Sequence, residues 1–153
     1  MKKKSEAERL LRFEGTTIQA LLEKSRLLEM ILDQIDALIY VKDTEGRYKY
    51  MNRNYHELFN FPHNEWEGRS DNELLNEDSA IKIRRNEQEV LMKGEPDSFE
   101  EVINVDGRER HLISYKVPLT STESYSGWIC GFATDITDFK REAPELECNE
   151  ILN

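Results

Sequence analysis

The stretch that decides the fold is GFATDITDFKR, residues 131–141, near the end of a chain of 153 residues. A run of small and apolar residues reaches Asp135, and a polar, charged segment follows at once. This change predicts a buried strand that ends at Asp135 and a helix that begins directly after it. The hydroxyl of Thr137 can accept an unpaired backbone N–H group of that helix, and Asp138 in the first turn favours the positive end of the helix dipole. The sequence therefore predicts a strand joined firmly to a following helix.

The composition of the chain limits its partners. Its 153 residues suffice for one domain with a core and some additional helix. It carries 31 acidic residues against 21 Lys and Arg, a net charge of -10, which opposes binding to the phosphate backbone of nucleic acids. We therefore expect no nucleic-acid partner.

The N-terminus and the cysteines indicate the cytoplasm. The Lys-rich start at residues 2–4 is followed by charged residues, so it does not resemble a secretory signal. No apolar run approaches the ~18 residues that span a bilayer, which argues against direct membrane insertion. Cys130 in a predicted strand and Cys148 in a polar tail do not predict a disulfide. We expect a cytoplasmic, reduced protein.

Residues 1–35 are predicted to form an N-terminal helical segment. Gly15, followed by a capping box of Thr16 and Gln19, predicts a break between a short helix at residues 5–13 and a firmer one at residues 17–34. Residues on alternating steps of three and four form a seam with the spacing of a coiled coil. The seam consists of Leu11, Glu14, Ile18, Leu21, Ser25, Leu28, Leu32 and Ile35.

Two interpretations of this seam remain open. The helix can pack as an amphipathic element against the rest of its own chain. It can also form the seam of a parallel homodimer, in which Ser25 lowers stability. The residues expected in that dimer interface are Ile18, Leu21, Leu28, Leu32 and Ile35.

From residue 37 the hydrophobic period changes from that of a helix to that of strands. Turn residues at 43–46 and the dipeptide Asp106-Gly107 predict two hairpins. Asn52 or Asn54 can cap the short helix, Asn76 or Asp78 can cap the longer one, and Gly94 is typical of a helix end. Five strands, short helices and one longer helix predict an α+β fold, in which a five-stranded antiparallel sheet carries these helices on one face, in addition to the N-terminal amphipathic helix. The strands are predicted at residues 38–41, 48–51, 99–105, 109–119 and 127–136, and the helices at residues 52–59 and 76–93.

This order of elements resembles the PAS fold, and residues agree with PAS domains at several points across residues 28–141. The closing Asp-Ile-Thr at residues 135–137 resembles the end of many PAS domains, where an output segment begins. The resemblance implies a PAS domain at residues 36–141, followed by a disordered or truncated connector at residues 142–153. The other matching motifs are Val41-Lys42-Asp43 with Gly46 and Asn52, Phe59-Asn60-Phe61 with Gly68-Arg69-Ser70-Asp71, and Asp106-Gly107 with Pro118, Gly127 and Gly131.

The same comparison argues against two family chemistries. Flavin photosensors of the LOV type carry a cysteine motif where residues 68–73 stand here, and these residues include no cysteine. Haem-binding relatives often use a histidine on the long helix, and residues 76–93 contain none. The histidines at 56, 63 and 111 lack the ligand spacing of a zinc site. The cofactor is therefore unknown, and we expect no metal site.

Side-chain alternation along the late strands predicts which residues face the interior. In flavin-binding relatives the position two before the final Asp faces the pocket, and here that position is Ala133. This choice places the bulky Tyr115, Trp128 and Phe132 on the outer face, which needs a cover such as the N-terminal helix. The alternative is a filled core without a cavity. The candidate ligand-binding residues are Tyr40, Tyr55, Ile83, Val102, Leu112, Ser114, Ile129, Gly131 and Ala133.

Catalytic arrangements find little support in the sequence. Glu100 and Glu101 are adjacent in a strand, so they lie on opposite faces and cannot converge on one bond. His56 and Glu57 imply no third member of a catalytic set. We therefore expect no catalytic residues and no enzyme in this chain.

The sequence favours a cytoplasmic PAS sensory module of the kind found in two-component systems. It is expected to form a homodimer, to bind a small molecule or a partner, and to relay that event through Asp135 and Thr137 to an output domain outside this chain. The alternatives are a ligand-free PAS domain that serves dimerisation or protein interaction, and, less favoured, a small stand-alone enzyme.

Overall fold

The computed structural model describes residues 2–61, 65–120 and 123–142, which belong to two compact units, one ending at Ile35 and one beginning at Asp36. The first unit is a single helix, α1 (Lys2–Gln34). The predicted break at Gly15 is wrong. The hydroxyl of Thr16 donates to the carbonyl of Arg12 at 2.9 Å, which places Thr16 inside the helix rather than at its start. Such bonds to the preceding turn are compatible with a helix, and one Gly costs only about 1 kcal/mol.

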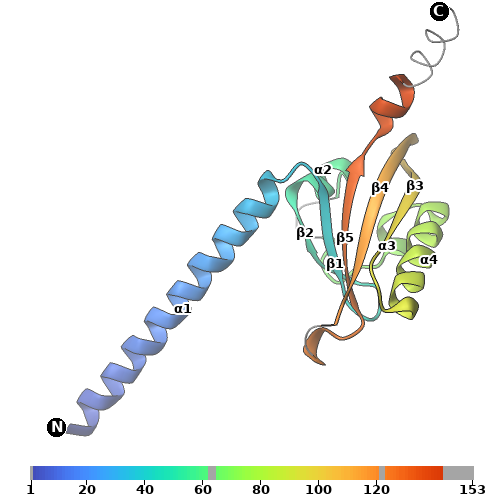
Figure 1. Ribbon diagram of the computed structural model, residues 1–153. Helices are drawn as coiled ribbons and strands as arrows, with labels where there is room; N and C mark the ends of the chain where they lie inside the picture. Colours follow the sequence, from blue (N-terminus) through green and yellow to red (C-terminus); the bar gives the residue numbers. More distant parts are fainter. Residues whose placement is uncertain (1, 62–64, 121–122, 143–153) are drawn as a thin grey trace, which may run out of the picture. The chain divides into compact units, whose positions relative to one another are not determined.

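The second unit contains a five-stranded antiparallel sheet in the order β2-β1-β5-β4-β3 (Figure 1). The predicted fold class is confirmed. The first and last strands of the sequence are neighbours at the middle of the sheet, so residues of β1 lie directly beside residues of β5. The strands are β1 (Leu38–Lys42), β2 (Tyr48–Met51), β3 (Asp97–Val105), β4 (Arg108–Leu119) and β5 (Trp128–Asp135).

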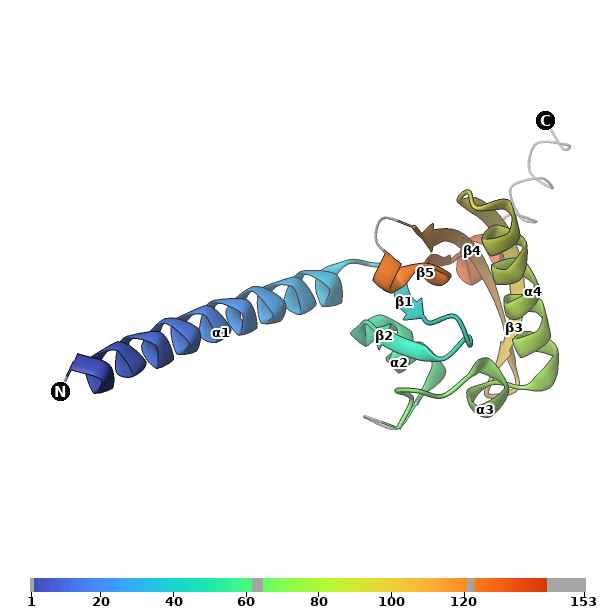
Figure 2. The same cartoon turned by 90° about the horizontal axis from the view of Figure 1, so that it is seen from below.

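Three α-helices, one 3-10 turn and a short C-terminal helical segment accompany the sheet. Asn52 caps α2 by accepting the N–H of Tyr55, and Asn76 caps α4 by accepting the N–H of Ser79. Gly94 ends α4 with a left-handed backbone, φ 72°, which glycine adopts without steric cost. Helix α4 runs along β3 (Figure 2). The elements are α2 (Arg53–Phe59), α3 (Asp71–Leu74), α4 (Glu77–Lys93), the turn η1 (Glu123–Tyr125) and a helical segment at residues 137–142.

The alternation predicted for β4 and β5 is present. Leu112 and Ala133 are buried on the inner face, whereas Tyr115 and Phe132 are exposed by 46% and 39% on the other face. The prediction for Val102 on β3 is wrong, because the residues before and after it face the interior and Val102 is only partly buried. The buried residues of β3 are Glu101, Ile103 and Val105.

Candidate functional site

The interior between the sheet and the helices contains ionised side chains. Two lysines lie on the inner face of the sheet, one on β1 and one on β4, and neither exposes more than 1% of its surface. Burial of a charge is unfavourable unless partners compensate it, so each lysine must find an acceptor within the protein. Three carboxyl groups serve as these acceptors. We call these five residues the buried ion cluster: Lys42, Asp71, Glu87, Glu101 and Lys116.

Lys42 lies at one end of this cluster. Its Nζ donates to both carboxylate oxygens of Asp71, at 2.8 and 2.6 Å, and to Oε1 of Glu87 at 2.7 Å. The rings of Tyr48 and Tyr40 lie 4.5 and 4.9 Å from the ammonium group, close enough for cation–π attraction. Lys42 therefore holds β1 to α3 and to α4 at once.

Tyr40 joins the two halves of the cluster. Its hydroxyl donates to Oε1 of Glu87 at 2.9 Å and accepts from Nζ of Lys116 at 3.0 Å. Lys116 also pairs with Oε1 of Glu101 at 3.0 Å, and the amide of Asn86 donates to the same oxygen at 2.8 Å. This half of the cluster thus links β1, β3, β4 and α4.

Two further tyrosines extend the network to β2 and α2. The hydroxyl of Tyr48 donates to Oδ1 of Asp71 at 2.6 Å and shares a hydrogen bond of 2.8 Å with the hydroxyl of Tyr55. A continuous chain of side-chain hydrogen bonds therefore runs from α2 through β2, α3 and β1 to α4, β4 and β3.

The remaining strand, β5, has a glycine, Gly131, where any other residue would place a side chain in the interior. Gly131 lies opposite Tyr40 on β1 and opposite Lys116 on β4. A Cβ atom at Gly131 would lie 2.2 Å from two carbon atoms of the Tyr40 ring. The ring thus fills the space above Gly131, and the hydroxyl reaches across β5 to Lys116.

Burial controls the protonation of the three tyrosines. It raises the pKa of Tyr40, Tyr48 and Tyr55 well above the ordinary value, and the nearby carboxylates raise the pKa of each further. The hydroxyls therefore stay protonated and act as hydrogen-bond donors.

The two carboxyl groups that share Lys42 differ. Burial raises the pKa of Asp71, the negative charge of Glu87 raises it further, and Lys42 only partly opposes them, so the net shift is upward. Burial also raises the pKa of Glu87, but the positive charges of Lys42 and Lys116 outweigh it, so the net shift is downward. Glu87 is therefore the more stable anion of the two.

Eight of the nine candidate ligand-binding residues lie in the interior. Tyr40, Gly131 and Ile129 are buried there, as expected. Val102 instead lines a surface groove of about 480 Å³ where α4 begins beside β3. The other buried candidates are Tyr55, Ile83, Leu112, Ser114 and Ala133.

Sequence reasoning missed the buried ion cluster, although the strand period contained a signal for part of it. Lys116 is in phase with Leu112 and Ser114, and Lys42 is in phase with Leu38. A charged residue at an inward position predicts an internal partner. Which carboxyl groups serve as partners is not visible in any local pattern.

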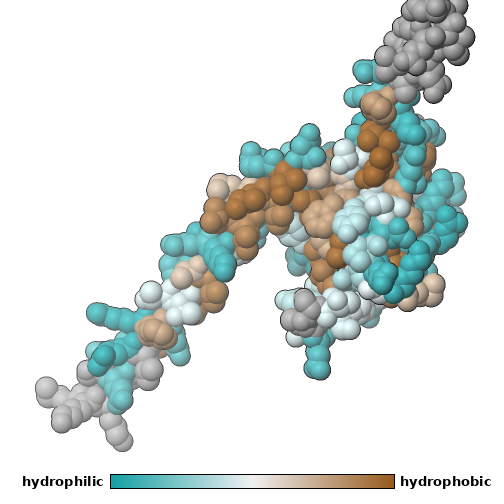
Figure 3. Space-filling view, viewed as in Figure 1, coloured by the Kyte–Doolittle hydropathy of each residue, from teal (hydrophilic) through white to brown (hydrophobic). Residues whose placement is uncertain are grey.

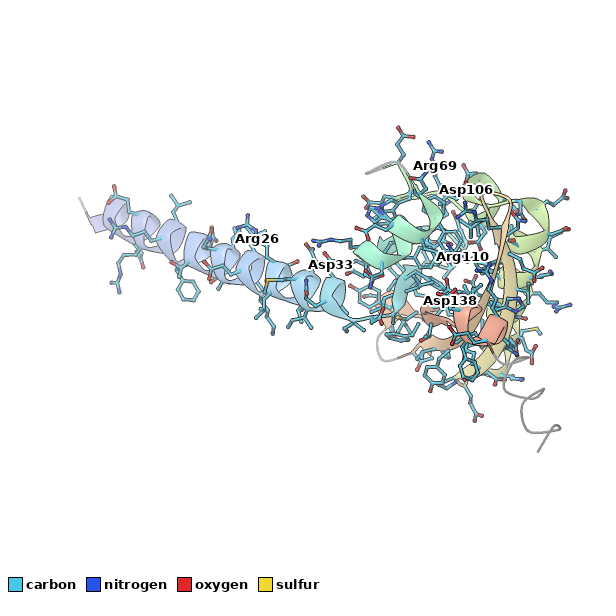
Figure 4. All side chains as sticks on the ribbon, turned by 90° about the horizontal axis from the view of Figure 1, so that it is seen from above. Arg26, Asp33, Arg69, Asp106, Arg110 and Asp138 are labelled. Atoms are coloured by element: carbon cyan, nitrogen blue, oxygen red, sulfur yellow. The ribbon has the colours of Figure 1, made fainter. Side chains whose placement is uncertain are left out.

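The junction after β5 is held to β4. Asp135 Oδ1 accepts the backbone N–H of Thr137 at 2.9 Å and also a hydrogen bond from its hydroxyl. The hydroxyl of Thr137 accepts the N–H of His111 on β4 at 2.9 Å, and Arg110 pairs with Asp135 at 3.3 Å. Figure 4 labels Arg110 on β4 and Asp138 in the segment after β5. The expected cap by Thr137 is corrected: Asp135 accepts the N–H group, and Thr137 attaches the junction to β4.

The apolar seam on α1 is exposed in the isolated chain. Ile18, Leu21 and Leu28 expose 58%, 63% and 52% of their surfaces, and Ile35 exposes 42%. Apolar side chains gather over the C-terminal half of α1 (Figure 3). Leu32 is partly buried.

Across residues 2–61, 65–120 and 123–142, no three His, Cys, Asp or Glu residues form a group that could hold a metal ion. Among the helices within these same ranges, none has the length and apolarity needed to cross a membrane.

The described residues form an α+β domain with a charged interior, and comparison with known proteins names the family. Residues 32–141 match the PAS fold family, so the chain belongs to it. It is 30% identical over 131 residues to the methanogenesis regulatory histidine kinase FilI of Methanothrix harundinacea, which supports a sensory signalling module. The match covers 84% of this chain but only 14% of that kinase.

Solved PAS structures share the fold. The PAS domain of Bordetella pertussis BvgS is 22% identical, with a TM-score of 0.59 over 83% of this chain and 98% of that one. The PAS domain of an HTR-like protein from Haloarcula marismortui is 19% identical, with a TM-score of 0.64 over 80% and 99%. VqmA of Vibrio cholera, in complex with ligand and DNA, is 22% identical, with a TM-score of 0.64 over 76% and 52%.

Proposed function

We propose that this chain is a cytoplasmic PAS sensory module that forms a homodimer through α1. It relays the binding of a ligand or partner to an output domain outside this chain, such as the kinase region of a two-component protein. The likeness to a histidine kinase supports this assignment. We propose no catalytic role, because the ionised groups of the interior are buried and bonded to one another.

The observation that carries this proposal is the position of β5. On its inner face, Gly131 contacts Tyr40, which belongs to the hydrogen-bonded network of the interior. At its end, Asp135 and Thr137 fix the start of the following helical segment to β4. A shift of the interior therefore has a short, well-packed route to the segment that leaves the domain.

A ligand-free module is the second candidate, and the packing around Tyr40 favours it. Because the Tyr40 ring fills the space above Gly131, a small molecule can enter there only if the ring moves. In this case the signal is the association of protein surfaces. The exposed Tyr115 and Phe132 on the outer face of the sheet are candidates for such contacts. We also infer that no flavin adduct forms, because residues 68–73 contain no cysteine.

Native mass spectrometry of the purified chain separates the two candidates. A retained small molecule, lost in a Tyr40→Trp variant that stays folded, supports ligand sensing. A ligand-free dimer supports the interaction module. Sedimentation measurements test the dimer itself, and a chain that stays monomeric at every accessible concentration would contradict both candidates.

A further inference from the structure

The buried ion cluster has an excess of acidic groups. It contains three carboxyl groups, on Asp71, Glu87 and Glu101, against the ammonium groups of Lys42 and Lys116, and each of these residues is at most 5% exposed. With every group ionised, the cluster carries one net negative charge. Such a charge in the interior is strongly unfavourable. One additional proton makes the cluster neutral.

The next cation lies beside Glu87 and not beside Asp71. Nη1 of Arg84 is buried 3.6 Å from Oε2 of Glu87, so its charge stabilises the Glu87 carboxylate, although the Arg84 side chain as a whole is 31% exposed. Oε2 of Glu87 is itself fully buried and accepts no hydrogen bond from the described residues.

The contacts indicate which carboxyl group takes the proton. Glu101 has Lys116 and the amide of Asn86 as partners. Glu87 is bonded to Lys42 and Tyr40, and the charge of Lys116 stabilises it further. The ionised partner of Asp71 is Lys42 alone, which Asp71 shares with Glu87.

The surroundings of Asp71 complete this picture. The titratable groups that face it are Lys42 and Tyr40 from β1, Tyr48 from β2, Tyr55 from α2 and Glu87 from α4. Of these, only Lys42 is a cation. Burial and the charge of Glu87 raise the pKa of Asp71, and they outweigh the charge of Lys42 and the hydrogen bonds from Lys42 and Tyr48, which lower it.

We propose that Asp71 is an internal proton-binding site, and that the protonation state of this carboxyl group regulates how firmly α3 is packed. The inference rests on the proposed sensory function for its biological meaning and names the proton as the signal. A proton needs no cavity, which suits an interior that Tyr40 already fills.

The direction of the response follows from linkage. Because the pKa of Asp71 is raised in the folded protein, the protonated form favours the packed state. As the pH rises through that pKa, the proton leaves to water and two carboxylates compete for the ammonium of Lys42. Packing of α3, whose first residue is Asp71, then weakens, whereas Glu87 keeps α4 attached to β1.

Carboxyl NMR titration of the whole chain tests the site, and amide hydrogen exchange tests its effect. The probe for exchange is the N–H of Leu75, which donates to the carbonyl of Asp71 at 2.7 Å. The protection factor of this N–H should fall as the pH rises. The pKa of Asp71 is expected to be higher with α3 packed than with α3 released, and each unit of that difference should lower the protection factor by up to about tenfold.

Two variants of the cluster have different expected results. Asp71→Asn mimics the protonated form, so α3 should stay protected and its pH response should disappear. Glu87→Gln removes the anion that competes with Asp71 for Lys42, so the pH response of α3 should become smaller, whereas the protection of α4 should fall because α4 loses its ionic bond to β1. Glu89→Gln, an exposed carboxylate of α4 that pairs with Lys93, is the control and should keep the wild-type response.

The inference is overturned if Asp71 titrates below its ordinary range, or if Asp71→Asn loses the protection of α3. The titration in the wild-type chain decides the question alone if either variant fails to fold. Exchange in residues 137–142 reports separately on the relay. If Asp71 titrates as expected while that segment does not respond, the proton site stands and the proposed relay fails.

Discussion

The ring of Tyr40 occupies the place where a side chain at Gly131 would begin. A Cβ atom there would lie 2.2 Å from Cε1 and Cζ of the ring and 2.6 Å from its hydroxyl oxygen. The two residues are directly opposite on neighbouring strands, and Lys116 is the next residue along the same row. The absent side chain therefore allows the Tyr40 hydroxyl to cross β5 and meet Lys116 at 3.0 Å.

Replacing Gly131 with alanine should destabilise the domain by about 1–3 kcal/mol, because the added methyl group displaces a buried ring that holds two hydrogen bonds. Urea unfolding measures the change. Gly15→Ala is the control, since no atom lies within 4 Å of a Cβ there, and removal of a helical glycine should stabilise α1 by about 1 kcal/mol. Unchanged stability in Gly131→Ala would show that the Tyr40 ring moves freely.

Lys42→Met should cost about 3–5 kcal/mol, because it leaves buried carboxyl groups without their cation. The free energy of unfolding in urea is again the measurement. Lys49→Met is the matched control: Lys49 pairs with Asp43 at 3.2 Å, but its side chain is 39% exposed, so its loss should cost less than about 1 kcal/mol. Equal losses in the two variants would contradict the assigned role of the buried ion cluster.

The homodimer should depend on the seam residues of α1 and not on the total number of apolar residues in this helix. Leu28→Glu places a charge within the predicted interface and should shift the sedimentation profile towards the monomer. Leu27→Glu adds the same charge next to it, outside the seam, at a residue with similar exposure. Deletion of residues 1–25 should weaken the dimer as well. A dimer that responds equally to both single substitutions does not use this seam.

Thr137→Ala should release the helical segment after β5. The change removes the acceptor of the His111 N–H and the hydroxyl bond to Asp135, and a local cost of about 0.5–2 kcal/mol is expected. Hydrogen exchange of residues 137–142 should accelerate accordingly. Thr134→Ala, the same substitution at an exposed position of β5, is the control. If exchange is unchanged, the attachment to β4 does not depend on this side chain.

The double variant Asp135→Ala with Thr137→Ala tests the relay. It should leave the interior unchanged, because neither residue contacts the buried ion cluster in the described part of the chain. The response of residues 137–142 to a perturbation of Tyr40, such as Tyr40→Phe, should disappear. Comparison of the exchange profiles of Tyr40→Phe with and without the double substitution measures this, and an equal response would assign the relay to another route.

The sequence by itself determined the order, type and approximate limits of the elements. This was possible because the signals are local: alternation along β4 and β5, the caps at Asn52 and Asn76, and the left-handed Gly94 each depend on neighbouring residues. The same local rules failed at Gly15, where the continuity of α1 outweighed a break signal.

Only the tertiary structure decided what fills the interior. Lys42 meets Asp71 and Glu87 across 29 and 45 residues of sequence, and Tyr40 meets Lys116 across 76. No periodic pattern encodes such pairings. Side-chain alternation along a strand directs some charged residues inward, and each of these charges needs a compensating partner in the interior. Which residue is the partner depends on which elements pack together. Thr137, which is buried at the end of β5, illustrates the same limit, since its acceptor role became definite only when β4 was placed beside it.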